Sequence, residues 1–145
     1  VAGALVGHAA VGQEKLREGG ERGRVDQRGQ AVVRLDLSRN PVGDAGARIV
    51  ASAPLTRLLT LNLYETQVGD DGLAALVNSP SLAALTELLL PDGRVTDEGA
   101  RHLLASPRFS ALTRLDLRLN PAIREPARRA LREAAARVPG LTLEL

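Results

Sequence analysis

A short pattern of aliphatic residues recurs four times along this chain, and it constrains the fold more than any other feature. The four copies begin as VVRLDL, LLTLNL, LTELLL and LTRLDL, and their central leucines lie 26, 27 and 27 residues apart. These leucines are Leu35, Leu61, Leu88 and Leu115. A shortened fifth copy closes the sequence with Val138, Leu141 and Leu143. A fixed period of this length predicts a solenoid, in which stacked coils contact only their neighbours.

Each copy carries the same local signals in the same order. Alternating aliphatic residues around the central leucine predict a short strand with one buried face. A turn position follows five residues after that leucine, and an apolar position follows two residues later. The turn residues are Asn40, Thr66, Gly93 and Asn120, and the apolar residues are Val42, Val68, Val95 and Ala122.

A helix is predicted after each turn. Acidic residues open the first three helices, and we expect Asp44, Asp70 and Asp97 to cap the free N–H groups of their own helices. Prolines end these three helices because proline cannot continue a helix. The predicted helices span residues 47–53, 73–77, 100–105 and 125–138. Strands stack about 4.8 Å apart and helices need more room, so we expect the solenoid to curve with its strands inside.

The segment LDLSRNPVGDAGA, from Leu35 to Ala47, resembles the leucine-rich repeat family and its ribonuclease-inhibitor-like subclass. The segment VTDEG, from Val95 to Gly99, is also similar to the cysteine-containing subclass, without its cysteines. The resemblance covers residues 31–145. It implies an α/β leucine-rich-repeat solenoid, a curved right-handed superhelix with short parallel strands on its concave face and helices on its convex face.

The chain departs from the family pattern at three positions. The family uses an asparagine at the turn to bond neighbouring backbone, whereas Thr66 can do so only in part and Gly93 not at all. We therefore expect weaker turns in the second and third copies. In the fourth copy Pro126 replaces the helix-opening glycine, and a longer, charged helix follows. We interpret this last unit as a capping repeat and a natural end of the array.

Residues 1–30 do not follow the repeat period. Their glycines and mixed charges predict a leader or linker, with at most a weak helix in residues 1–16. We therefore divide the chain into this leader and a leucine-rich-repeat domain of residues 31–145, which holds four repeats, a C-terminal capping helix and a last strand. The sequence begins with valine and contains no methionine, so we expect a fragment or a processed chain.

Catalytic, metal-binding and phosphate-binding patterns are missing from the sequence. His8 and His102 have no second ligand at metal spacing, and His102 falls on a tolerant helix position. The glycine-rich residues 19–23 lack the lysine and the strand–turn–helix context of a phosphate loop. The three recurring aspartates follow the period of the fold, which favours capping over calcium binding. We therefore expect no catalytic residue, no metal and no cofactor, and we predict that the protein is not an enzyme.

Composition narrows the classes of partner. The chain has no cysteine, which excludes disulfides and suits a reducing, cytoplasmic location. Its formal charge of +2 attracts nucleic acid or anionic membranes only weakly, and no apolar run approaches the roughly 18 residues of a membrane span. Arginines in the last helix suggest a nucleic-acid patch, but without aromatic residues for base stacking the solvated face of a capping helix is the better interpretation. These arginines are Arg124, Arg128, Arg129, Arg132 and Arg137.

The strand positions that point away from the core form the candidate functional surface. The scaffold leucines are constant, whereas these positions vary from copy to copy. Tyr64, Leu89 and Pro91 would form an apolar centre with charged residues around it, which is typical of a protein interface. The opposing interpretation is that every solenoid has such a face and that one tyrosine lies there by chance. The candidate partner-binding residues are Arg34, Asp36, Asn62, Tyr64, Glu87, Leu89, Pro91, Arg114, Asp116 and Arg118.

The leading hypothesis is a non-catalytic module that presents its concave face to a protein partner whose identity stays open. We expect a monomer unless the N-terminal edge strand pairs with another chain. The first alternative is an architectural spacer from a longer repeat array. A regulator of small GTPases, as found among relatives of the subclass, is a second alternative, although no residue matches that role. A nucleic-acid-binding repeat protein is the third.

Overall fold

A computed structural model describes residues 32–145 of the chain. The predictions made for the leader, including the weak helix, His8 and the glycine-rich segment, lie outside these residues. Five short strands alternate with four α-helices in the described part. The strands are β1 (Arg34–Asp36), β2 (Thr60–Asn62), β3 (Glu87–Leu89), β4 (Arg114–Asp116) and β5 (Thr142–Glu144). The helices are α1 (Gly43–Ser52), α2 (Asp70–Val77), α3 (Asp97–Ala105) and α4 (Glu125–Ala135), with short 3-10 helices η2 (Pro80–Leu82) and η3 (Pro107–Ala111).

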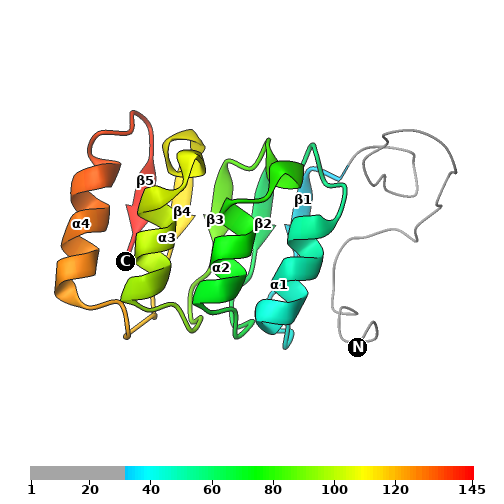
Figure 1. Cartoon of the computed structure of the whole chain (residues 1–145), viewed down its shortest axis with the longest axis horizontal. Coiled ribbons are helices and arrows are strands. Elements are labelled where there is room, and N and C mark those ends of the chain that lie inside the picture. The colour runs from blue at the N-terminus through cyan, green and yellow to red at the C-terminus, as the bar shows by residue number, and fades with distance from the viewer. Residues whose placement is uncertain (1–31) are drawn as a thin grey trace, which may run out of the picture.

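The strands form one parallel sheet in chain order, and the helices form a second layer along one face of it (Figure 1). Leu35 pairs with Leu61, Leu61 with Leu88, Leu88 with Leu115, and Leu115 with Leu143. The central leucines therefore share one interior row, as the repeat period predicted. Backbone bonds extend the pairing beyond the strands; the N–H of Leu37, for example, donates to the carbonyl of Asn62 at 2.9 Å.

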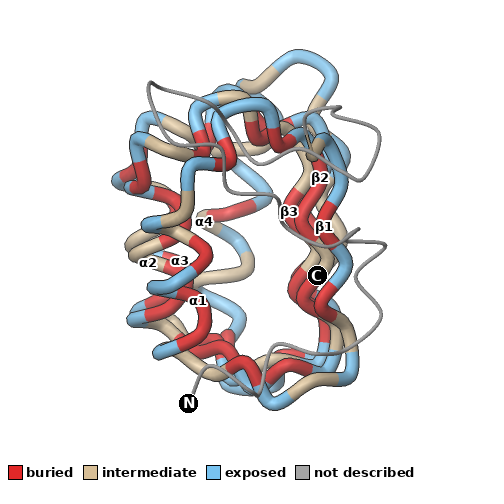
Figure 2. Tube along the Cα trace, turned by 90° about the vertical axis from the view of Figure 1, so that its right-hand side faces the viewer, coloured by how far each residue is buried: buried red, intermediate tan, exposed pale blue. Residues whose placement is uncertain are grey.

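The core lies between the two layers. Seen along the stack in Figure 2, the buried stretches line the inner sides of both the strand layer and the helix layer. Each coil contributes two strand leucines and one helix residue to continuous columns, and burial of each such side chain contributes roughly 1.5–3 kcal/mol. The helix column consists of Val50, Leu76, Leu103 and Leu131, all buried.

The fourth repeat is shifted by one residue, which corrects two predictions. Ala122 was expected in the apolar column, but it is exposed, and Ile123 fills that column with only 1% of its surface accessible. The shift carries into α4, so Ala127 takes the place that Gly99 has in α3. That position had been assigned to Pro126 from the sequence alone. The cause is one additional residue in the turn before Ile123, which the strand spacing alone could not reveal.

The recurring aspartates do cap helices, but each caps the helix of the next repeat and not its own. The Oδ1 atom of Asp44 accepts hydrogen bonds from the N–H groups of Gly69 at 2.7 Å and Gly72 at 3.0 Å, at the start of α2. One carboxylate oxygen of Asp70 does the same for Thr96 and Gly99 at the start of α3, at 2.8 and 2.9 Å. The expectation of capping within one helix was therefore wrong.

Two glycines make this contact between repeats possible. A Cβ atom on Gly72 would lie 2.6 Å from the Asp44 carboxylate, and one on Gly99 would lie 2.5 Å from that of Asp70. Any side chain at these positions would push the capping aspartate away. The glycine two residues after Asp70 or Asp97 therefore lets the aspartate of the preceding coil approach the helix closely.

Replacing Asp70 by alanine should lower the free energy of unfolding by about 1–2 kcal/mol, the usual effect of losing a helix cap. The variant loses the two backbone bonds in α3 and a third bond from the Thr96 hydroxyl at 2.6 Å. Urea unfolding followed by circular dichroism measures the change. Asp71→Ala is the matched control, since the Asp71 side chain is 75% exposed and its single partner within the described residues is Arg48, at 3.5 Å. Equal stability of the two variants would contradict the capping role.

Serines make the reverse connection at the other end of the helices. The hydroxyl of Ser79, just before η2, donates to the carbonyl of Ala51 in α1. The hydroxyl of Ser106, just before η3, donates to the carbonyl of Val77 in α2 at 2.7 Å. The second and third repeats are thus each bonded to the following repeat through an aspartate and to the preceding repeat through a serine.

Asn120 bonds the turn of its own repeat to the turn of the repeat before it. Its Nδ2 group donates to the carbonyls of Leu117 and Leu90, both at 2.9 Å, and its Oδ1 accepts from the N–H of Val95 at 3.1 Å. Gly93 leaves the room for this side chain, because a Cβ there would lie 3.0 Å from Oδ1 of Asn120. The third turn has no asparagine of its own, and Asn120 of the fourth repeat forms hydrogen bonds with its backbone instead.

Candidate functional site

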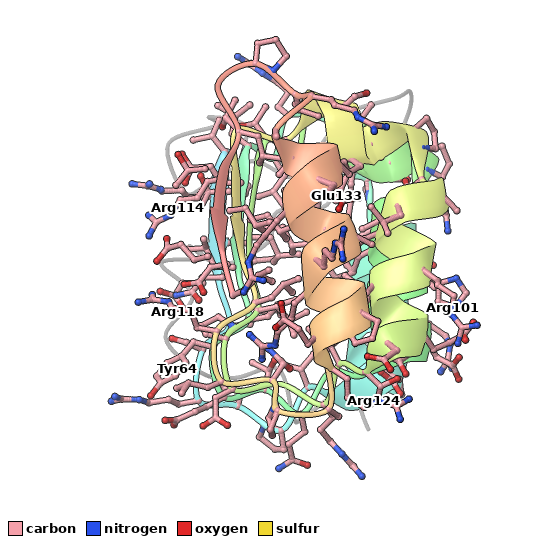
Figure 3. All side chains as sticks on the ribbon, turned by 90° about the vertical axis from the view of Figure 1, so that its left-hand side faces the viewer. Tyr64, Arg101, Arg114, Arg118, Arg124 and Glu133 are labelled. Carbon is pink, nitrogen blue, oxygen red and sulfur yellow. The ribbon has the colours of Figure 1, made fainter. Side chains whose placement is uncertain are left out.

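The outward side of the sheet is free of helices in the described part of the chain. We call the outward side chains of β1 to β5 and of the turns that follow them the open face. Figure 3 shows Arg114, Arg118 and Tyr64 projecting from this face, whereas Arg101 and Arg124 lie on the helix side. Since neighbouring parallel strands lie about 4.8 Å apart, outward residues at the same register form rows across the sheet. One row runs through Arg34, Thr60, Glu87, Arg114 and Thr142.

Asp36 and Asn62 are joined at the β1 end of the open face. The carboxylate of Asp36 accepts from the Asn62 amide at 3.1 Å and from the backbone N–H of Ser38 at 2.9 Å. Burial acts to raise the pKa of Asp36, but the bonds from Ser38 and Asn62 outweigh it and lower the pKa below its usual value. Asp36 is therefore held as an anion in a fixed orientation.

Tyr64 lies half-buried in the turn after β2, beside two oppositely charged side chains. The guanidinium carbon of Arg39 lies 5.7 Å from the centre of the Tyr64 ring, and Arg39 pairs with Glu65 at 3.7 Å. The hydrogen bond with Glu65 raises the pKa of the Tyr64 hydroxyl further above its usual value. The arrangement gives the turn after β2 a ring with a polar tip, which is a common interface anchor.

Four charged side chains form a continuous network at the β4–β5 end. Arg114 and Arg118 both bind Glu144, at 3.0 and 3.2 Å, and Arg118 also binds Asp116 at 2.7 Å. Burial raises the pKa of Asp116, but the hydrogen bonds and charge of Arg118 outweigh it and lower the pKa. Asp116 is only 3% exposed, so the expectation that it offers contact surface is corrected: it orients Arg118 instead.

The centre of the open face carries one carboxylate, that of Glu87 on β3, beside uncharged side chains. Leu89 is half-buried, and Thr60 and Asn62 lie beside it on β2. Pro91 was predicted to share the exposed apolar centre, but it is buried, because its place in the turn after β3 lies between the turns of the adjacent repeats. The apolar centre therefore consists of the half-buried Leu89 and Tyr64 without Pro91.

The strand pattern missed a second row of outward residues in the turns. These residues stand four positions after the central leucine of each repeat and all adopt left-handed backbone conformations, with φ between 51° and 59°. They are Arg39, Glu65, Asp92 and Leu119. Leu119 is 66% exposed, and its positive φ is uncommon for a leucine. The repeat period itself was the signal that could have identified this row.

The arginines of the last helix are engaged within the protein. Arg124 binds Asp97 at 2.7 Å, Arg129 binds Glu133 at 2.9 Å, and Arg132 binds Glu125 at 2.8 Å. Arg128 donates to the carbonyl of Ile123 at 2.7 Å. Three of the five arginines are therefore paired with carboxylates, and within residues 32–145 the side chain of Arg137 makes no such contact.

The described residues hold no cluster of metal-binding type. Among residues 32–145 no three histidine, cysteine, aspartate or glutamate side chains come together in a way that could hold an ion. His102 lies half-exposed on α3, with its Nε2 atom 3.7 Å from Glu98. No helix in this part of the chain is long and apolar enough to cross a membrane.

An open groove lies at the C-terminal end of the stack, and no sequence pattern indicated it. The half-buried leucines of the last strand and the inner side of α4 enclose about 310 Å³. The groove exists because no further coil covers β5 in the described structure. Its lining residues are Arg132, Ala135, Ala136, Leu141, Leu143 and Leu145.

Two stretches of the sequence, residues 32–49 and 56–77, match the family described as Leucine Rich repeat. They correspond to the coils of β1–α1 and β2–α2, and the remaining coils repeat their register. These two coils are leucine-rich repeats. No curated protein matches the sequence. The predicted α/β leucine-rich-repeat solenoid is confirmed, and repeats of this family generally mediate protein–protein binding.

Proposed function

We propose that this leucine-rich repeat protein is a non-catalytic binding module that holds a protein partner on the open face of its sheet. The face has a half-buried apolar centre at Leu89 and Tyr64, with charged networks on both sides. This arrangement of apolar centre and charged rim is typical of protein interfaces. The absence of cysteine supports the further proposal of a cytoplasmic location.

The observation that carries the proposal is that the charged rim is assembled before any partner binds. Asp116 and Glu144 hold Arg118, while Arg39 is held between Glu65 and the Tyr64 ring. Side chains that are already ordered lose little conformational entropy on binding.

Variants of the apolar centre test the proposal. Leu89→Asp and Tyr64→Ala should each reduce capture of partner proteins from a cell lysate at least about tenfold, since central anchors dominate binding energy. Ile49→Asp is the matched control, because Ile49 is an exposed apolar residue, 48% accessible, on α1 at the helix side. Circular dichroism checks that all variants are folded. If the four proteins capture the same set in the same amounts, the open face is not the binding surface.

The alternatives receive less support from the described residues. Four arginines of the last helix already have partners within the protein, which weakens the proposal of nucleic-acid binding. No described residue takes a role in GTPase regulation. The architectural spacer predicts that neither Leu89→Asp nor Tyr64→Ala changes capture, so the same experiment separates it from the binding module.

A further inference from the structure

One acidic side chain on the strands of the open face has no partner among residues 32–145. Asp36 is bonded to Asn62, Asp116 to Arg118, and Glu144 to two arginines. The carboxylate of Glu87, in contrast, makes neither a hydrogen bond nor an ion pair with any residue of the described range 32–145. Glu87 lies on β3, the middle strand, and is only half-exposed.

The neighbours of Glu87 explain why it stays unpaired. Across the sheet it pairs in register with Thr60 on one side and Arg114 on the other. Arg114 is engaged elsewhere, since its Nε and terminal nitrogen both bind the same oxygen of Glu144, at 3.2 and 3.0 Å. Thr60 is 8% exposed and carries no charge. The nearest cation therefore turns away from Glu87 toward β5.

The position of Glu87 also joins it to the apolar centre. It lies two residues before Leu89 on the same strand, so both side chains point outward on the same face. A half-buried carboxylate has lost part of its hydration and has free acceptor sites for a cationic donor. An aliphatic group from the same partner would cover Leu89 at the spacing of two residues in an extended segment.

We infer that Glu87 selects the partner of the open face, and that this partner presents an arginine or lysine side chain next to an aliphatic one. The inference rests on the proposed function and specifies its chemistry. The partner cation binds the carboxylate of Glu87, while the aliphatic group packs on Leu89. Arg114 and Arg118, fixed by Glu144, exclude a partner that places its positive charge over β4.

Two short peptides test the inference on the full chain. Acetyl-Leu-Ala-Arg-Ala-Leu-amide carries the cation two residues from each aliphatic side chain, and acetyl-Leu-Ala-citrulline-Ala-Leu-amide has nearly the same shape without the charge. In nitrogen-15 NMR titrations we expect the amide signals of β2, β3 and β4 to shift. The arginine peptide should bind about fivefold more tightly than the citrulline peptide, the size of one partly exposed ion pair.

Two variants show whether Glu87 is responsible. Glu87→Gln should abolish the difference between the peptides, whereas Glu133→Gln should preserve it, because Glu133 lies on α4 and pairs with Arg129. Equal affinities in the wild type, no shifts in β2 to β4, or a difference that survives in Glu87→Gln would each overturn the inference.

The two experiments fail separately. If Leu89→Asp loses the captured partner while the peptides bind alike, the binding module stands and the role of Glu87 falls. If the arginine preference depends on Glu87 but capture is unchanged in Leu89→Asp and Tyr64→Ala, the cation site stands and the proposed function falls.

Discussion

Leu88→Ala should destabilise the protein by about 3–5 kcal/mol, the upper range for a buried leucine that leaves a cavity. Leu88 is fully buried on the middle strand, and the central leucines of the adjacent strands lie on both sides of it. The coils above and below are fixed by their own pairing, so they cannot move in to fill the space. Urea unfolding monitored by circular dichroism measures the loss.

Leu119→Ala is the control for this substitution. Leu119 is 66% exposed and belongs to no core column, so its truncation should change stability by no more than about 0.5 kcal/mol. A similar loss for both leucines would show that the interior row does not hold the solenoid together.

Asn120→Ala is expected to cost about 3 kcal/mol, since it leaves several buried backbone groups without partners at about 1–3 kcal/mol each. Asn120 is fully buried, and the substitution removes the bonds to Leu90, Leu117 and Val95 at the same time. The loss should appear in urea unfolding and in faster amide exchange at Val95.

The matched control is Asn78→Ala. Asn78 is exposed and donates one bond, to the carbonyl of Ala74 at 2.9 Å, so its loss should stay within about 0.5 kcal/mol. Unchanged amide exchange at Val95 in Asn120→Ala would disprove the bond between the third and fourth turns.

The repeat period was sufficient to predict the fold. It placed all five strands and the order of the helices, because the leucine columns can be buried only when the coils stack in register. The first three helices begin three or four residues earlier than predicted, at Gly43, Asp70 and Asp97, and the fourth ends at Ala135 and not at residue 138. It could not predict which repeat a polar side chain serves. Asp44 and Asp70 were assigned to their own helices, since a sequence shows the nearest N–H groups but not the close approach that Gly72 and Gly99 allow.

The candidate site was predicted less completely than the fold. Alternation correctly placed Glu87 and Leu89 on the outward side of β3. The alternation does not show which outward side chains the neighbouring coils bury. Asp116 and Pro91 were therefore expected to be exposed, although both are buried. The pairing of Arg114 with Glu144, which leaves Glu87 without a partner, depends on side-chain conformations that the repeat pattern does not determine.

The aspartate and serine contacts join nearest neighbours only, and they recur with the same partners in successive coils. If residues 62–88 were excised, Asp44 would meet Thr96 and Gly99 where it now meets Gly69 and Gly72. The junction would thus be re-formed from groups already present. A gene encoding such a chain can lengthen or shorten by whole units without new compensating changes, and the width of the surface it displays can evolve in steps of one strand.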